Sequence, residues 1–171
     1  MSKRFVIIRH AKSSWATLGQ ADFDRPLNDR GKKDAPQMAK YLLEKKIQID
    51  SFISSPAKRA RKTAALFAKA FGIDENAIQL KSQLYLPDEV AFSHAIETAS
   101  DKYAHLAIFS HNPGITHFVN SLTSQVRVDN IPTCGIFGIK TNAVSWKDFE
   151  KAEKEFWFFD YPGNHGLTHS S

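Results

Sequence analysis

The apolar run Phe5-Val6-Ile7-Ile8 places the strongest constraint on the fold. Its β-branched and aromatic residues follow one another without the alternation of a strand that has one face in water. Such a run is typical of a central strand buried on both faces of a parallel sheet. It ends abruptly at Arg9-His10. We therefore expect an α/β fold built around this strand.

Strands and helices alternate along the rest of the chain. Asn28 can cap one helix, and Ser55-Pro56 predicts a second that starts with Ser55 as its N-cap and ends at Gly72. A third is expected over about 87–99, and a fourth begins near Pro113. Further strands are expected at 51–54, 77–80, 106–109, 135–140 and 155–159. This order predicts an α/β sandwich with a largely parallel central sheet.

Length and composition fit one domain. A chain of 171 residues, 42% hydrophobic and 24% charged, is long enough for one well-packed core and short for two. We assign residues 1–161 to that domain. Residues 162–171 are rich in Gly, His and Ser and are expected to form a flexible tail in which His165 and His169 are solvated.

The N-terminal segment predicts a cytoplasmic protein. Positive charge at Lys3-Arg4 precedes an apolar run of four residues, which is too short for the core of a signal peptide or for a membrane span. The single cysteine, Cys134, cannot form an internal disulfide, and no Cys/His spacing resembles a zinc site. We expect no membrane partner.

The formal net charge of +5 favours an anionic partner. Charge alone leaves a phosphorylated molecule, a nucleic acid and an acidic protein surface open. The densest basic stretch, Lys58-Arg59-Ala60-Arg61-Lys62, would spread around a helix. It lacks the interleaved aromatic residues of an RNA-binding segment, so we do not expect a nucleic-acid partner.

Three polar clusters follow predicted strands. They are Arg9-His10, residues 55–59 and Ser110-His111-Asn112. In open α/β sheets, ligands bind outside the carboxyl ends of the strands, so these clusters can converge although they are far apart in sequence. Helix N-termini at the same edge add unpaired N–H groups that favour an anion. Convergence would bring together two histidines and two arginines.

That set of side chains suits phosphate better than a metal. Arginine cannot ligate a metal, and no carboxylate accompanies the histidines. The planar guanidinium of Arg9 or Arg59 can instead hold two phosphoryl oxygens and offset the charge that develops on them. A neutral imidazole can attack phosphorus and form a covalent intermediate that water hydrolyses.

The residues also resemble a known family. The run Arg9-His10-Ala11-Lys12-Ser13-Ser14-Trp15 is similar to the opening motif of the histidine phosphatase superfamily (phosphoglycerate mutase-like), in the form found in SixA-type phosphohistidine phosphatases. Further matches follow in order at 24–31, 54–63 and 110–113, so the resemblance spans roughly residues 4 to 140. Most of the superfamily has glycine where this chain has Ala11.

The resemblance implies roles for four residues. His10 would be the phosphorylated nucleophile, Arg9 and Arg59 would bind phosphate, and His111 would be the second histidine of the pocket. The family fold is a three-layer α/β/α sandwich, in agreement with the strand and helix pattern. No metal or other cofactor is implied.

The superfamily includes mutases, phosphomonoester hydrolases and phosphohistidine phosphatases, and the fold does not choose among them. Larger members use insertions to cover a small substrate, whereas this chain has little length left after its sheet and helices. We therefore expect a protein substrate that carries phosphohistidine, such as a histidine phosphotransfer protein. The alternative is a small-molecule phosphate ester. A module that only binds phosphate would not need the nucleophile His10.

At the position of the proton donor, this sequence is least like the wider superfamily. Where the acid-phosphatase branch has an aspartate after the second histidine, this chain has Asn112, which cannot donate as a carboxylic acid. Asp88 and Glu89 are the other acids near the expected rim of the site. They could serve as general acids or could be first-turn residues of a solvated helix, which their charge would stabilise. The sequence leaves both readings open.

Overall fold

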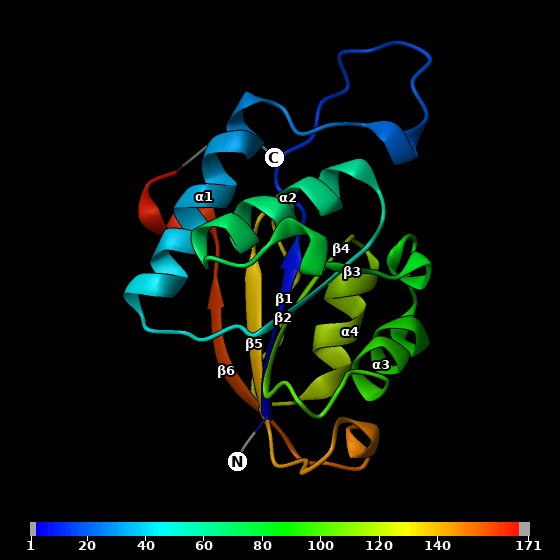
Figure 1. Cartoon of the computed structure of the whole chain (residues 1–171), viewed down its shortest axis with the longest axis vertical. Coiled ribbons are helices and arrows are strands. Elements are labelled where there is room, and N and C mark those ends of the chain that lie inside the picture. The colour runs from blue at the N-terminus through cyan, green and yellow to red at the C-terminus, as the bar shows by residue number, and fades with distance from the viewer. Residues whose placement is uncertain (1–2, 168–171) are drawn as a thin grey trace.

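The computed structural model describes residues 3–167 and centres on a six-stranded sheet with the order β3-β2-β4-β1-β5-β6 (Figure 1). The strands are β1 (Lys3–Arg9), β2 (Ser51–Ser54), β3 (Gln79–Leu80), β4 (His105–Ser110), β5 (Ile136–Thr141) and β6 (Lys154–Asp160). The pairs β1–β4, β2–β4 and β2–β3 are parallel, and β5 pairs antiparallel with both β1 and β6. Among the described strands, β5 alone therefore runs against the others. The largely parallel sheet is confirmed.

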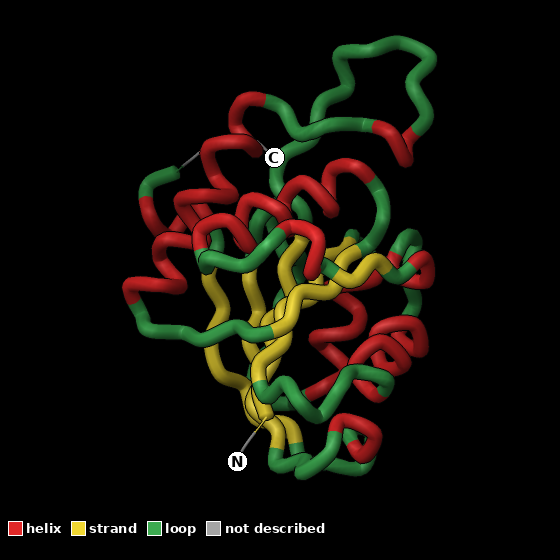
Figure 2. Tube along the Cα trace, in the orientation of Figure 1, coloured by secondary structure: helices red, strands yellow, loops and turns green. Residues whose placement is uncertain are grey.

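Four α-helices cover the sheet in two layers. They are α1 (Asp29–Glu44), α2 (Lys58–Ala70), α3 (Glu89–Glu97) and α4 (Gly114–Leu122). Helices α1 and α2 lie together on one face, and α3 and α4 lie on the other (Figures 1 and 2). This is the expected three-layer α/β/α sandwich.

Strand β1 shows why its apolar run does not alternate with polar residues. Val6 and Ile8 belong to the cluster that packs under α1 and α2. Phe5 and Ile7 point the other way and join the cluster under α3 and α4. Because successive side chains of a strand face opposite sides, both faces of β1 are apolar and both are buried.

Two helices start later than the sequence predicts. Ser55 is not the N-cap of α2, which begins at Lys58 with Ala57 in the cap position. The Ser55 hydroxyl is engaged elsewhere: its Oγ accepts from Ala57 N at 3.2 Å and lies 2.7 Å from His111 Nε2. Helix α3 begins at Glu89 because the Asp88 carboxylate caps it, accepting a hydrogen bond from Ala91 N at 2.8 Å.

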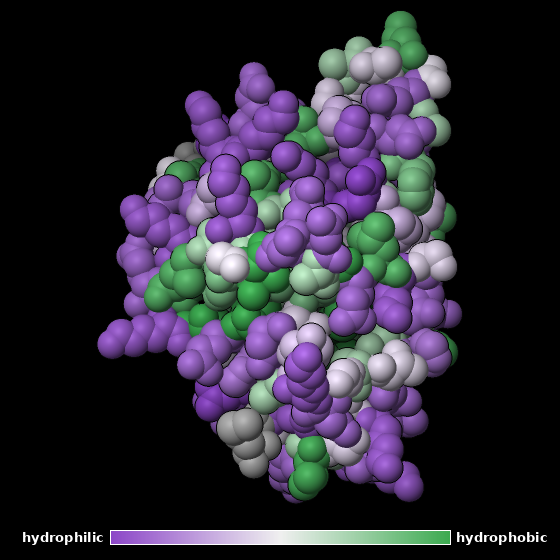
Figure 3. Space-filling view, in the orientation of Figure 1, coloured by the Kyte–Doolittle hydropathy of each residue, from purple (hydrophilic) through white to green (hydrophobic). Residues whose placement is uncertain are grey.

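The segment between β1 and α1 projects beyond the sheet, at the upper right of Figure 2. It contains the short 3-10 helix η1 (Asp22–Asp24). Trp15 and Leu18 in this segment are 77% and 97% exposed, and Figure 3 shows hydrophobic surface at the tip of the projection. A single bridge, Ser13 to Leu27, closes its base.

Part of the segment expected to form the C-terminal tail adopts a short helix. Pro162–His165 form the 3-10 helix η5, and Pro162 is buried. The His165 ring stacks on Tyr41 at 3.6 Å, and its Nε2 lies 2.8 Å from the buried Asp160 carboxylate. Because that carboxylate needs a partner away from water, it holds the segment against the body of the protein. His169 lies outside the described residues.

Within residues 3–167, no helix has both the length and the apolar composition needed to cross a membrane. The longest helix, α1, has 16 residues, many of them charged.

Candidate active site

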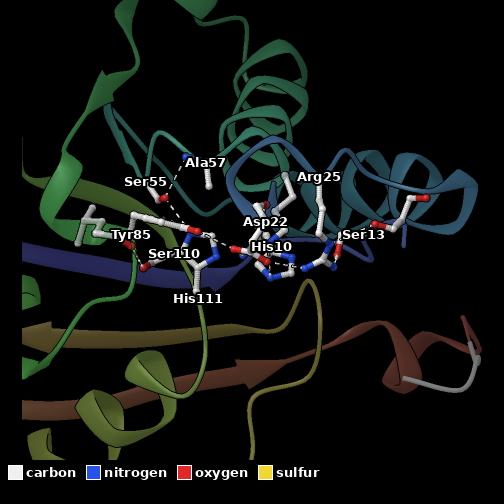
Figure 4. Close-up of polar contacts among 12 residues, drawn as sticks. His10, Ser13, Asp22, Arg25, Ser55, Ala57, Tyr85, Ser110 and His111 are labelled. Atoms are coloured by element: carbon white, nitrogen blue, oxygen red, sulfur yellow. Dashed lines mark hydrogen bonds and ion pairs between the residues drawn. The ribbon is translucent and has the colours of Figure 1, made fainter. Parts of the chain in front are cut away.

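The carboxyl ends of three parallel strands form the floor of the site. Arg9 is the last residue of β1 and pairs in register with Ser110, the last residue of β4. His10, Ser55 and His111 are the residues that follow β1, β2 and β4, and all three are buried. Figure 4 shows Ser55, His111 and His10 close together above the strand ends. The convergence expected from the sequence is present.

His10 has a defined orientation. Its Nδ1 lies 2.8 Å from the carbonyl oxygen of Ala11, so Nδ1 carries the ring proton and donates it there. Its Nε2 is then unprotonated, and the lone pair of this atom accepts a long hydrogen bond from Arg59 Nε at 3.4 Å. Ala11 is itself fixed, because its N–H donates to Thr63 Oγ1 of α2 at 3.0 Å. The arrangement gives a buried imidazole whose available nitrogen faces an arginine.

Burial keeps both histidines neutral. Desolvation has the largest effect and lowers the pKa of His10 well below 6.5; the Ala11 hydrogen bond opposes it, and His111, Arg59 and Arg9 lower the pKa further. Desolvation and Arg59 lower the pKa of His111 to about 3. At neutral pH the imidazole of His10 is therefore available as a nucleophile rather than protonated.

His111 lies beside His10, with ring centroids 5.2 Å apart. Its Nε2 is 2.7 Å from Ser55 Oγ. The Ser55 hydroxyl, which also accepts from Ala57 N, can donate its proton to this nitrogen, and the ring proton of His111 is then on Nδ1. Nδ1 is buried and has no hydrogen-bond partner among the described residues.

Arg9 offers a second buried donor. Its Nη1 donates to the carbonyl oxygen of Ile131 at 3.0 Å, whereas its Nε is buried without a partner in the described part of the chain. Burial and the neighbouring Arg59 lower the pKa of Arg9. Buried donors are almost always hydrogen-bonded in proteins. Unpaired N–H groups of Arg9 and His111 beside His10 suit the oxygens of a bound oxyanion.

Three residues of the site were not singled out by sequence reasoning: Asp22, Arg25 and Tyr85. The Asp22 carboxylate accepts from Tyr85 OH at 2.7 Å, from Arg25 Nη1 at 2.8 Å and from Arg59 Nη2 at 3.1 Å. These contacts, the Tyr85 hydrogen bond first, hold the pKa of Asp22 far below its usual range. Arg25 also donates to the Ser14 carbonyl and to Ser13 Oγ.

The sequence contains a partial indication that Asp22 and Arg25 belong to the site. Arg25 lies inside the second stretch that resembles the family, and Asp22 is three residues before it. The path of the segment between β1 and α1 could not be predicted, because it has no periodic pattern. The meeting of Asp22 with Tyr85, 63 residues away, was therefore not visible in the sequence.

The residues at the positions considered for a proton donor form a side-chain bridge (Asn112), a helix cap (Asp88) and an exposed first-turn position (Glu89). The side chain of Asn112 forms hydrogen bonds with Asn130, Ile131 and Thr116. These bonds connect the turn that follows β4 both to α4 and to the segment at 130–131. Asp88 caps α3, and Glu89 is an exposed residue of its first turn. Among the described residues, no hydrogen bond connects Asp88 or Glu89 with His10, Arg59 or His111.

The site also lacks the ligands of a metal centre. No group of three or more His, Cys, Asp or Glu side chains in the described part of the chain is arranged to hold a metal ion. The positive charge around His10 comes from arginines, of which Arg59 is 6% exposed.

Comparison with known proteins identifies similar sequences. A sequence profile described as the histidine phosphatase superfamily (branch 1) matches residues 5–84. An uncharacterised protein of Mycobacterium tuberculosis strain H37Rv is 30% identical over 152 residues, which cover 84% of this chain and 92% of the relative. An uncharacterised chloroplastic protein of Arabidopsis thaliana is 40% identical over 63 residues, 37% of this chain, and the chain spans 29% of that relative's length.

Solved structures agree with the fold. A protein from Agrobacterium tumefaciens, provisionally described as the phosphohistidine phosphatase SixA, superposes with a TM-score of 0.78 and 25% identity, covering 95% of this chain and 100% of that one. A structure of the protein histidine phosphatase SixA complexed with tungstate gives a TM-score of 0.80 at 20% identity, covering 95% and 99% of the two chains.

Proposed function

Because this chain belongs to the histidine phosphatase superfamily, we propose that it removes phosphate from a phosphorylated histidine on a partner protein, with His10 as the nucleophile. The observation that carries the proposal is the orientation of His10. Its Nδ1 is fixed by the Ala11 carbonyl, and its unprotonated Nε2 faces Arg59. A neutral imidazole held in this way can attack phosphorus directly.

In the proposed first step, the lone pair of His10 Nε2 forms a bond to phosphorus as the bond to the substrate's ring nitrogen breaks. Arg9, Arg59 and His111 donate hydrogen bonds to the phosphoryl oxygens. They are positioned before the reaction, so they stabilise charge in the transition state with little rearrangement. His10 thereby becomes a phosphohistidine.

In the second step, water attacks phosphorus and His10 leaves. The Ala11 carbonyl keeps a proton on Nδ1 of His10 throughout. The phosphorylated ring is therefore cationic, and it leaves as a neutral imidazole when the bond at Nε2 breaks. The proton released by the attacking water goes to phosphate and solvent. No protein acid is needed for this step.

Leaving-group chemistry favours phosphohistidine over an alkyl ester. An alkoxide leaves slowly unless a general acid protonates it, a contribution of roughly 10²–10⁴-fold. Asn112 has no acidic proton, Asp88 caps α3 and Glu89 is an exposed residue of its first turn, whereas Asp22 is ionised. An imidazole leaves readily once its ring is protonated. The likeness to the Agrobacterium SixA structure points the same way.

The surroundings of the site suit a protein substrate. The segment that carries η1 projects beside the strand ends and exposes Trp15 and Leu18. We propose a partner such as a histidine phosphotransfer protein, with no nucleic acid and no membrane involved. A cytoplasmic location fits the single, buried Cys134.

We further propose that the reaction needs no divalent metal, since arginine side chains supply the positive charge that metal ions supply in other phosphoryl-transfer sites. EDTA should leave the rate of the dialysed enzyme unchanged. Activity that disappears with EDTA and returns with magnesium would contradict this assignment.

A comparison of substrates tests the proposed function. The purified enzyme is given a phosphohistidine-bearing phosphotransfer protein, a set of alkyl phosphate monoesters and p-nitrophenyl phosphate, and kcat/KM is measured for each. We expect the phosphoprotein to be the preferred substrate and the alkyl esters to react slowly. Alkyl esters that react as fast as the phosphoprotein would favour a small-molecule phosphatase instead.

A further inference from the structure

Asp22 accepts hydrogen bonds from residues on two sides of the site, close to solvent. Arg59, in the first turn of α2, donates from Nη1 to the Asp22 carbonyl at 2.7 Å and from Nη2 to its carboxylate at 3.1 Å. Tyr85, which follows the 3-10 helix η3 (Ser82–Leu84), donates to the same carboxylate at 2.7 Å. Arg25 also donates a hydrogen bond to the Asp22 carboxylate. In Figure 4, Asp22 lies next to His10, between Tyr85 and Arg25.

The carboxylate of Asp22 lies one guanidinium group away from the nucleophile. The Nε of Arg59 faces His10 Nε2 at 3.4 Å, and its Nη2 holds Asp22. The Asp22 side chain is 43% exposed, whereas His10 and His111 are 7% and 3% exposed. Asp22 is therefore the solvent-accessible end of this chain of contacts, and His10 is its buried end.

Asp22 cannot act as a general acid in this environment. Hydrogen bonds from Tyr85, Arg25 and Arg59 stabilise its ionised form and hold its pKa far below the usual range. It has no proton to give to an alkoxide near neutral pH. An ionised carboxylate has up to four acceptor positions, and the contacts to its side chain use three. Asp22 can accept one more hydrogen bond.

An aromatic pair adjoins this carboxylate. The rings of Phe23 and Tyr85 pack edge to face at 5.1 Å, and Tyr85 lies edge to face with His111 at 5.6 Å. Phe23 is 38% exposed, so the pair lines the mouth of the site. Aromatic surfaces of this kind pack well against a flat heteroaromatic ring.

We propose that Asp22, Phe23 and Tyr85 form a subsite for the imidazole ring of the substrate's phosphohistidine. In this subsite the Asp22 carboxylate accepts a hydrogen bond from the ring nitrogen that does not carry phosphate. The proposal rests on the function proposed above and specifies how the leaving group is recognised. An alkyl or aryl ester has no N–H group at this position.

The protons and electrons of the step balance without a protein acid. The distal ring nitrogen of the substrate takes a proton from water, and Asp22 stabilises the resulting cationic ring. The His10 Nε2–phosphorus bond forms as the phosphorus–nitrogen bond of the substrate breaks, and its electron pair returns to the ring nitrogen. The ring leaves as neutral imidazole with its proton on the distal nitrogen. Asp22 remains ionised throughout.

The test compares Asp22→Asn with the wild type on two small substrates. Phosphoimidazole has the distal nitrogen, whereas p-nitrophenyl phosphate has none and releases a phenolate that needs no proton. Asp24→Asn is the matched control, because Asp24 is an exposed carboxylate of the same helix, η1. Thermal unfolding of each variant checks that it is folded.

We expect Asp22→Asn to lower kcat on phosphoimidazole by about tenfold to a hundredfold, the usual value of a hydrogen bond to a charged group. It should change kcat on p-nitrophenyl phosphate less than about threefold, since that reaction makes no use of the bond. Equal losses on both substrates would mean that Asp22 only holds Arg59 in place, and would overturn the proposal. No loss on either substrate would overturn it as well.

The pH dependence of kcat gives a second readout, because it reports groups in the enzyme–substrate complex. The Asp22 carboxylate contacts Arg25, Arg59 and Tyr85. His111 and His10 are the next titratable groups, on the buried side of these residues. If its carboxylate stabilises the protonated ring, kcat on phosphoimidazole should fall at a lower pH in Asp22→Asn than in the wild type. Asp24→Asn should keep the wild-type profile, since Asp24 is an exposed carboxylate of η1 outside the subsite. Identical profiles for wild type and Asp22→Asn would contradict the subsite.

Failure of the subsite is distinguishable from failure of the proposed function. A wild-type enzyme that hydrolyses alkyl esters but neither phosphoimidazole nor a phosphohistidine protein would refute the function itself. A wild-type enzyme that prefers phosphohistidine, combined with equal losses in Asp22→Asn, would refute the subsite alone.

Discussion

Arg59 and His111 differ from Asp88 and Glu89 in what surrounds them. The first two are buried beside His10, whereas Asp88 caps α3 and Glu89 is an exposed residue of its first turn. We expect Asp88→Asn and Glu89→Gln each to lower kcat/KM on a phosphohistidine protein less than about tenfold, well below the general-acid range. Arg59→Ala and His111→Ala should be far more damaging.

Steady-state kinetics of the four variants checks this difference. The Asn and Gln substitutions preserve shape, and Asn is itself a good N-cap, so α3 should remain capped. If either carboxylate proved as indispensable as His10, a general acid would exist that the proposed mechanism does not contain, and an ester substrate would become the better assignment.

The four residues predicted from the sequence share one property that the other site residues lack. Arg9, His10 and His111 lie at or just after the ends of strands with apolar runs, and Arg59 lies in the first turn of the helix that follows β2. Their convergence follows from the geometry of a parallel sheet. Asp22, Arg25 and Tyr85 lie in irregular segments, where local sequence does not determine the path of the chain. Their contacts depend on tertiary packing.

At the scale of elements, the first turn of α1 packs closely against the segment that follows His10. A Cβ atom added to Gly31, in the first turn of α1, would lie 2.2 Å from the backbone oxygen of Lys12. The same oxygen accepts a hydrogen bond from Asn28 N at 3.0 Å. This close approach requires glycine, since the neighbouring atom belongs to the backbone and cannot rotate away.

We therefore expect Gly31→Ala to destabilise the protein by about 1–3 kcal/mol, the usual cost of overpacking. In an unconstrained helix the same substitution would stabilise by up to about 1 kcal/mol, so the sign of the change is diagnostic. Urea unfolding measures it. A stability equal to or above that of the wild type would show that α1 and the segment after His10 can separate freely.

The elements themselves were largely predictable, and the errors have identifiable causes. The buried strands β1 and β4 contain continuous apolar runs, and they and β2 appear where the sequence places them. Helix α2 starts late because the hydroxyl of Ser55 bonds to His111, a residue 56 positions away. The reversed direction of β5 is set by how the chain returns to the sheet, which strand composition does not encode.

At the scale of the whole molecule, burying two neutral histidines makes folding sensitive to acid. The folded pKa of His111 is about 3, below its unfolded value near 6.5. As pH falls through 6.5, the unfolded state takes up a proton that the folded state does not, so stability decreases between about pH 6.5 and pH 3. The pKa of His10 is lowered too and acts in the same direction.

We expect Tm to fall between pH 7 and pH 4, and to fall less in His111→Gln, which removes one of the two titrating groups and can still bond to Ser55. Differential scanning fluorimetry across this range compares the two proteins. Parallel pH dependence in both would show that His111 titrates normally in the folded state, contrary to its burial.

The central claim is that His10 carries phosphate during turnover, and trapping that intermediate tests it most directly. The enzyme is mixed with a ³²P-labelled phosphohistidine protein, quenched within milliseconds and separated from substrate. The account predicts enzyme-bound label that is lost in acid and stable in base, as a phosphorus–nitrogen bond requires, and that is absent from His10→Ala. Label that survives in His10→Ala, or that resists acid, would contradict it.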